Sequence, residues 1–97
     1  MRYRLRVLGE VAGFLHALHP EIRRKIKSGL KVILSEPMEG KSLHEELRGL
    51  RSFRVGRTRI IYKVASEGII EIVAIGPRRT VYEETYRLLK KMLPSEG

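Results

Sequence analysis

Residues 50–65 have the sequence LRSFRVGRTRIIYKVA, which carries the clearest strand pattern of the chain. Apolar and polar residues alternate on both sides of Gly56-Arg57, which predicts two antiparallel strands over 50–55 and 58–65. A glycine in the first position of a two-residue loop suits a type II′ hairpin turn. The two strands are therefore expected to pair directly, with a register that the turn fixes.

That register places Arg54 directly opposite Arg59 on the neighbouring strand. Like charges that face each other across a strand pair destabilise it. The pair makes physical sense if a phosphate lies between the two side chains, because guanidinium groups match the geometry of phosphate oxygens. The alternative is that both are solvated charges, or that they pair with one of three glutamates, Glu45, Glu46 or Glu71.

Four further cationic side chains are candidates for the same phosphate-binding face. Arg57 lies in the turn itself, and Lys63 continues the face of Arg59 along the strand, although a solvated charge is the simpler interpretation of Lys63. Arg78 and Arg79 follow the next strand and lie at the start of the last helix, whose N-terminus favours anions. We therefore expect a cluster of arginines on one face of the sheet that binds a nucleic-acid backbone.

Tyr82 lies one turn into the last helix, close to Arg78 and Arg79. A tyrosine whose phenolate is stabilised by guanidinium groups can act as a general base. A tyrosine that simply packs on the sheet is the simpler interpretation, and the same two alternatives apply to Tyr86.

The remaining segments predict one α+β domain that spans residues 1–97, in the order β-α-α-β-β-β-α. A small, largely antiparallel sheet is expected to carry an N-terminal helical hairpin and a C-terminal helix. A strand with alternating arginines is expected near a sheet edge, and an almost continuous apolar strand at the centre. The expected ranges are 2–8 for the edge strand, 10–18 for the first helix, a second helix from Pro20, a loop over 36–43, a turn over 66–68, the central strand over 69–75 and the last helix over 80–93.

Composition limits the classes of partner and cofactor. The net charge of +9 indicates an anionic partner, such as nucleic acid or an acidic protein. Cysteine is absent and no histidine has metal-ligand spacing with carboxylates, so neither a metal nor a small-molecule cofactor is expected. Short apolar runs and the lack of a signal-peptide core predict a cytoplasmic protein without a membrane partner. The lack of Asn, Gln, Asp and Trp is typical of a thermophilic protein, with compositional drift as the alternative.

Two motifs together resemble the RelE/ParE toxin superfamily. Residues 49–64, GLRSFRVGRTRIIYKV, are similar to the hairpin that characterises these proteins, and residues 75–82, IGPRRTVY, are similar to their Gly-x-Arg-Arg-x-x-Tyr motif. The expected order of strands and helices also fits, so the resemblance covers nearly the whole chain.

The resemblance implies a toxin of a type II toxin–antitoxin pair with an acidic, RelB-like antitoxin. RelE-like members enter the ribosomal A site and cut mRNA without a metal, using the 2′-hydroxyl of the RNA as the nucleophile on the adjacent phosphate. By this resemblance Arg59 stabilises the pentacoordinate phosphate, Arg78 steadies the transition state or protonates the leaving oxygen, and Tyr82 is the base. The phosphate-binding group is then Arg54, Arg57, Lys63 and Arg79.

The chain departs from the superfamily pattern at two positions. Arg54 stands where an active-site lysine is common, and Gly56 stands where a second lysine can occur. Arginine binds phosphate well but gives up its proton very reluctantly, so fewer proton-transfer groups are present. Two alternatives therefore remain beside the ribosome-dependent endonuclease: a ParE-like inhibitor of DNA gyrase, and a non-catalytic, RNA-binding degenerate toxin.

Overall fold

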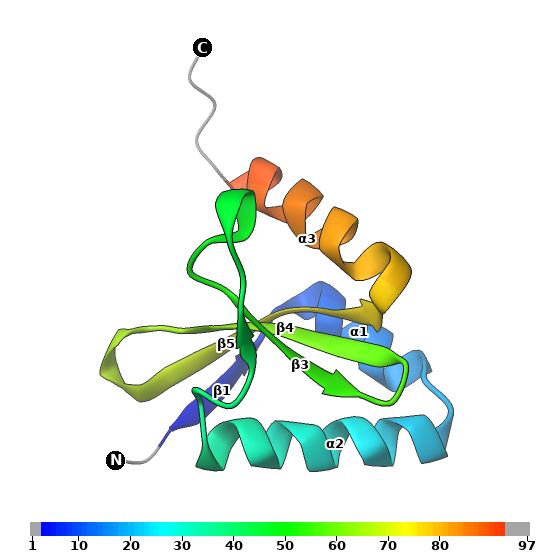
Figure 1. Cartoon of the computed structure of the whole chain (residues 1–97). Coiled ribbons are helices and arrows are strands. Elements are labelled where there is room, and N and C mark those ends of the chain that lie inside the picture. Colours follow the sequence, from blue (N-terminus) through cyan, green and yellow to red (C-terminus); the bar gives the residue numbers. More distant parts are fainter. Residues whose placement is uncertain (1–2, 93–97) are drawn as a thin grey trace.

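The computed structural model describes residues 3–92 of the chain. Its elements follow the predicted order, with one short strand added (Figure 1). They are β1 (Arg4–Val7), α1 (Gly9–Ala17), α2 (Pro20–Ser35), β2 (Lys41–Ser42), β3 (Arg51–Val55), β4 (Thr58–Val64), β5 (Ile69–Pro77) and α3 (Arg78–Met92), with single 3-10 turns over Glu45–Leu47 and Ser66–Gly68.

The strands form one sheet within the described residues, in the order β1-β5-β4-β3-β2. β1 runs parallel to β5, and every other neighbouring pair is antiparallel. The α+β class is confirmed, as is the position of β1 at an edge of the sheet. Arg4 and Arg6 are exposed on this edge strand, where charges discourage pairing with another chain.

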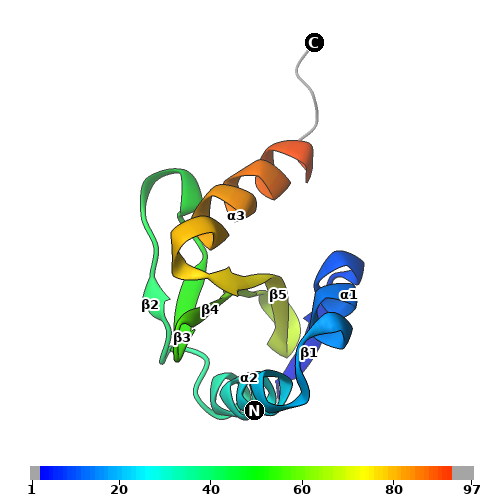
Figure 2. The ribbon, with the colours of Figure 1, turned by 90° about the vertical axis from the view of Figure 1, so that its right-hand side faces the viewer.

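Helices cover both faces of the sheet (Figure 2). On one face, Val11 of α1 and Ile26 and Ile33 of α2 pack with β4 and β5 in the larger core. On the other face, Val81 of α3 packs on a smaller core that includes Ile61 of β4. The helical hairpin and the C-terminal helix therefore lie on opposite sides of the sheet, which leaves the turn between β3 and β4 uncovered at one end.

β5 contributes to both cores because its register shifts against β4. Ile61 pairs with Ala74 whereas Tyr62 pairs with Ile72, so Val73 is the extra residue of a β-bulge. A bulge of one residue reverses the alternation of side chains beyond it. Ile72 and Ile75 consequently face the same core although they are three residues apart. The predicted central strand, buried on both faces, is confirmed.

The limits of several predicted segments were wrong: β1, α1, β3 and β4 differ by one described residue at one or both ends, and three further segments differ more. The expected loop over 36–43 contains β2, which is formed by pairing of Lys41 with Ser52 and of Ser42 with Arg51. Two residues are too few to show a period-two pattern, so only the partner strand defines this element. β5 continues to Pro77, opposite Thr58, and α3 therefore begins at Arg78 rather than at residue 80. Residue 2 of the edge strand and residue 93 of the last helix lie outside the described residues.

Tyr62 joins the segment after α2 to the sheet. Its side chain is fully buried, and its hydroxyl donates to the carbonyl of Pro37 at 2.7 Å and accepts from the N–H of Gly40 at 2.9 Å. Nη1 of Arg51 donates to the carbonyl of Gly40 at 2.7 Å. A Cβ at Gly40 would overlap the Tyr62 ring. These contacts hold the chain in place where it enters β2 and the hairpin.

No helix among the described residues is both long enough and apolar enough to cross a membrane.

We expect Tyr62→Phe to destabilise the fold by about 1–3 kcal/mol, because it leaves a buried carbonyl and a buried N–H without their partner. Chemical denaturation measures the free energy of unfolding. Tyr86→Phe is the matched control, since Tyr86 is 40% exposed and the loss of its hydroxyl should change stability little. An equal effect of the two substitutions would contradict the importance of the Tyr62 contacts.

Stability should also fall at alkaline pH. Burial raises the pKa of Tyr62, and Glu39 adds to the increase, whereas the Gly40 hydrogen bond and Arg51 oppose it. Because the pKa is higher in the folded state, the protonated Tyr62 hydroxyl contributes its full stabilisation below the unfolded pKa of about 10. This stabilisation is lost as the pH rises above that value. Between about pH 9 and about pH 12, the free energy of unfolding should therefore fall more steeply with pH in the wild type than in Tyr62→Phe. Parallel curves would contradict this.

Candidate functional site

The β3–β4 hairpin has the predicted turn and register. Gly56 has a φ of 62°, which suits the first position of a type II′ turn. Val55 pairs with Thr58, and Arg54 pairs with Arg59. Two arginines therefore do face each other across the strand pair, on the face of the sheet that carries α3.

A cavity of about 300 Å³ opens beside this pair. On its other side Arg59 is opposite Gly76 of β5. Five of the lining residues are arginines, and no acidic side chain is among them. The lining residues are Arg54, Gly56, Arg57, Arg59, Pro77, Arg78 and Arg79. The cavity is thus a concentrated positive site of a size that suits a phosphate group and its neighbours.

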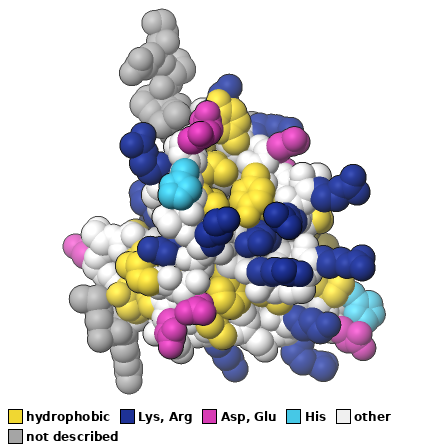
Figure 3. Space-filling view, in the orientation of Figure 1, with side chains coloured by type: hydrophobic (Ala, Val, Ile, Leu, Met, Phe, Trp, Pro, Cys, Tyr) yellow, Lys and Arg dark blue, Asp and Glu magenta, His cyan; other side chains and the backbone are white. Residues whose placement is uncertain are grey.

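The start of α3 supplies the second wall of the cavity. Arg78 and Arg79 are the first residues of this helix and are both exposed. The backbone N–H of Arg78 donates to the carbonyl of Arg57 at 3.4 Å, which ties the helix start to the turn. The partial positive charge at a helix N-terminus adds to that of the side chains. Figure 3 shows Lys and Arg side chains gathered over the hairpin and this end of α3.

Arg54 and Arg59 have different surroundings although they face each other. Arg54 is exposed, and its Nε donates to the carbonyl of Gly56 at 2.9 Å, so its side chain lies over the turn. Arg59 is half-buried, and its Nη1 donates to the hydroxyl of Ser52 at 3.2 Å. Its Nε is buried without any hydrogen-bond partner. A buried donor without a partner on a charged side chain is costly.

Tyr82 reaches Arg59 through Ser52. The Tyr82 side chain is half-buried and packs on the smaller core, and its hydroxyl lies 3.2 Å from Oγ of Ser52. It does not itself line the cavity. Tyr86 is exposed, and Nζ of Lys90 lies 4.9 Å from the centre of its ring. Of the two tyrosines considered from the sequence, Tyr82 is the one connected to the arginine pair.

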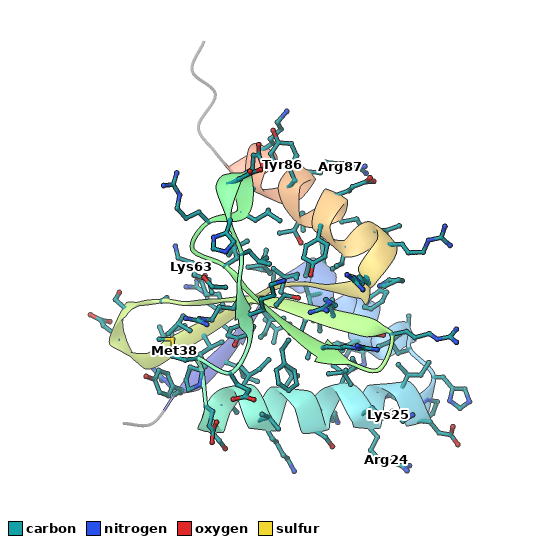
Figure 4. The ribbon with its side chains drawn as sticks, in the orientation of Figure 1. Arg24, Lys25, Met38, Lys63, Tyr86 and Arg87 are labelled. Carbon is teal, nitrogen blue, oxygen red and sulfur yellow. The ribbon has the colours of Figure 1, made fainter. Side chains whose placement is uncertain are left out.

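Lys63 is the expected phosphate ligand that lies apart from the cavity. It is exposed, lies opposite Glu71 in the pairing of β4 with β5, and is near the end of β4 that is remote from the turn (Figure 4). The five arginines named from the sequence all line the cavity.

Sequence reasoning missed Ser52. Its side chain is 2% exposed, although serine is usually found at the surface. The signal was present in the alternation of β3, which places Ser52 on the same face as Arg54 and therefore under the arginine cluster. Within residues 3–92 no group of three or more His, Cys, Asp or Glu is placed to hold a metal ion.

Comparisons with known proteins place the chain in a family. Residues 8–82 match the family described as the ParE toxin of the type II toxin–antitoxin system, parDE. No curated protein matches the chain.

Solved structures share the fold. The RelBE2 toxin–antitoxin complex from Mycobacterium tuberculosis is 28% identical with a TM-score of 0.72, covering 80% of this chain and 100% of that one. The archaeal RelE–RelB complex from Pyrococcus horikoshii is 25% identical with a TM-score of 0.68, covering 80% and 97%. A doubly substituted E. coli RelE in the free state is 20% identical with a TM-score of 0.76, covering 96% and 100%, and shows the fold alone.

Because the matched family spans most of the chain, including the hairpin and the start of α3, this protein belongs to the ParE toxin family of type II toxin–antitoxin systems, within the RelE/ParE superfamily, and has a RelE-like fold.

Proposed function

We propose that this toxin is a ribosome-dependent mRNA endonuclease, in which the 2′-hydroxyl of the RNA attacks the adjacent phosphate. The observation that carries the proposal is the Arg59 guanidinium, whose buried Nε has no partner beside a cavity lined by five arginines. A single phosphate of an RNA backbone in this cavity would supply acceptors for the guanidinium groups that line it. It would also relieve the repulsion between Arg59 and Arg54.

Charge stabilisation is the main catalytic term in this proposal. Attack by the 2′-hydroxyl places extra negative charge on the pentacoordinate phosphorus and its equatorial oxygens. Cations that are already fixed around that position stabilise the transition state without reorganisation. Arg59 serves this role, because a hydrogen bond to the buried Ser52 hydroxyl holds its guanidinium in place. Arg54, Arg57 and Arg79 bind the phosphate and its neighbours.

Tyr82 is the proposed base, and Arg78 is the proposed partner of the leaving oxygen. Tyr82, as its phenolate, removes the proton of the 2′-hydroxyl, directly or by way of a water molecule, from its position behind Arg59 and Ser52. Arg78 lies on the opposite wall of the cavity and stabilises the leaving oxygen. Because arginine keeps its proton, we assign Arg78 an electrostatic contribution, and the leaving oxygen takes its proton from water.

The proposed partners are the ribosome with its mRNA, and an acidic, RelB-like antitoxin. Complexes with RelB are among the solved structures that resemble this chain. A net charge of +9 would accelerate association with an acidic chain through electrostatic steering. We place these encounters in the cytoplasm.

A ParE-like inhibitor of DNA gyrase is the second candidate function. The observation that favours it is the family match, which names ParE rather than RelE. In this case the arginines would bind an acidic surface or a nucleic-acid backbone without chemistry.

We expect Arg59→Ala to lower the rate of mRNA cleavage by about 10²–10³-fold, the loss that follows removal of one preorganised transition-state donor. Cleavage is measured by mapping cut sites on message in a translating extract. Arg24→Ala, an exposed position on α2, is the control and should cleave at the wild-type rate. Intact message with the wild-type protein, together with inhibited supercoiling by gyrase, would replace the endonuclease by the second candidate.

Tyr82→Phe should lower the cleavage rate by about 10²-fold or more, because it removes the proposed base and leaves the ring in place. Tyr86→Phe removes the same hydroxyl four residues further along α3, at an exposed position, and should leave the rate unchanged. The comparison is made in the same extract at matched protein concentration. Equal rates for the two variants would exclude Tyr82 as the base.

A further inference from the structure

Ser52 is a buried hydroxyl between the two groups on which the proposed reaction depends. Its Oγ lies 3.2 Å from Nη1 of Arg59 and 3.2 Å from the hydroxyl of Tyr82. The three side chains come from β4, β3 and α3. Ser52 is thus a polar link between the hairpin and the C-terminal helix, next to Arg59 and outside the lining of the cavity.

The chemistry of the three groups fixes the direction of one of these hydrogen bonds. A guanidinium has only donors, so Oγ of Ser52 must accept from Arg59. The second lone pair of Ser52 can accept from the Tyr82 hydroxyl, or the Ser52 hydroxyl can donate to the oxygen of Tyr82. The second arrangement is the one that holds Tyr82 as a phenolate, the form that the proposed base requires. The link therefore orients the Tyr82 hydroxyl as well as the guanidinium.

The backbone of Ser52 gives this link a fixed position. Ser52 pairs with Ile61 of β4 on one side and with Lys41 of β2 on the other. Its side chain is 2% exposed, so bulk water does not compete for its hydrogen bonds. A hydroxyl on a strand with neighbours on both sides is held more rigidly than one on a loop. Small displacements of catalytic groups are costly, since about 1 Å can reduce a rate by about 10²-fold.

We propose that Ser52 is a positioning residue that sets the orientation of both Arg59 and Tyr82 toward the bound phosphate. This role rests on the proposed endonuclease function. Ser52 does not line the cavity and is not itself expected to touch the RNA. Its contribution should therefore appear in the rate of the chemical step rather than in the binding of mRNA.

Three substitutions separate this role from simple packing. Ser52→Ala removes the hydroxyl. Ser52→Cys keeps the size of the side chain but supplies only a weak donor and acceptor, and Ser52→Thr keeps the hydroxyl. Ser28→Ala is the matched control, because Ser28 is exposed on α2 and its hydroxyl bonds only to the carbonyl of Arg24 in the same helix.

The measurement is the cleavage of message by the full-length protein on translating ribosomes, with kcat and KM separated and thermal melting recorded for each variant. We expect Ser52→Ala and Ser52→Cys each to lower kcat by about 10- to 100-fold with KM changed less than about threefold. Ser52→Thr should recover most of the rate. In a Tyr82→Phe background the further loss from Ser52→Ala should be much smaller, because the two residues act as a unit.

The contrary outcomes can be told apart. Wild-type rates for both Ser52→Ala and Ser52→Cys would overturn the positioning role and leave the proposed endonuclease intact. A loss in Ser52→Ala that is undiminished in the Tyr82→Phe background would also overturn it, since the effect would not pass through Tyr82. A lower melting temperature with unchanged kcat would show a packing role only. Intact message with the wild-type protein would remove the proposed function itself.

Discussion

The register of the β3–β4 hairpin is the constraint on which the site depends. Side chains alternate between the faces of a strand, so a shift of one residue would move every one of them to the opposite face. The two-residue turn at Gly56-Arg57 excludes that shift and places Arg54, Arg59 and Ser52 on the face that carries α3. The fold accepts two facing like charges there. That cost to stability is consistent with a site that is shaped for an anion.

The bulge in β5 completes the arrangement from the other side. Because Val73 is unpaired, the end of β5 beyond it can face both cores with apolar residues and still present Gly76 opposite Arg59. A Cβ at Gly76 would lie in ordinary contact with Val81 and Glu84, so α3 packs closely on this end of the strand. β5 then ends at Pro77, and α3 begins at once, so that Arg78 and Arg79 arrive at the same cavity. One irregular strand thus serves the cores and the site together.

The arginines are not equivalent once their surroundings are known. Four of those that line the cavity are exposed, where water screens their charges. Arg59 is half-buried and has a polar partner only on its inner side, through Ser52. This difference makes Arg59 the centre of the proposed chemistry and the other arginines its electrostatic surroundings. Ser52 also connects Arg59 to Tyr82, which packs on the smaller core and does not line the cavity.

Local patterns in the sequence predict every described helix and strand except β2, together with the hairpin register and the arginines at its end, because turn chemistry and period-two alternation act over a few residues. Which of these residues meet depends on the tertiary structure. β2 exists because β3 lies beside it, Lys63 lies apart from the cavity, and Ser52 joins Arg59 to Tyr82 across thirty residues of chain. Such contacts depend on how three elements pack around a bulge, and no local pattern in the sequence specifies that packing.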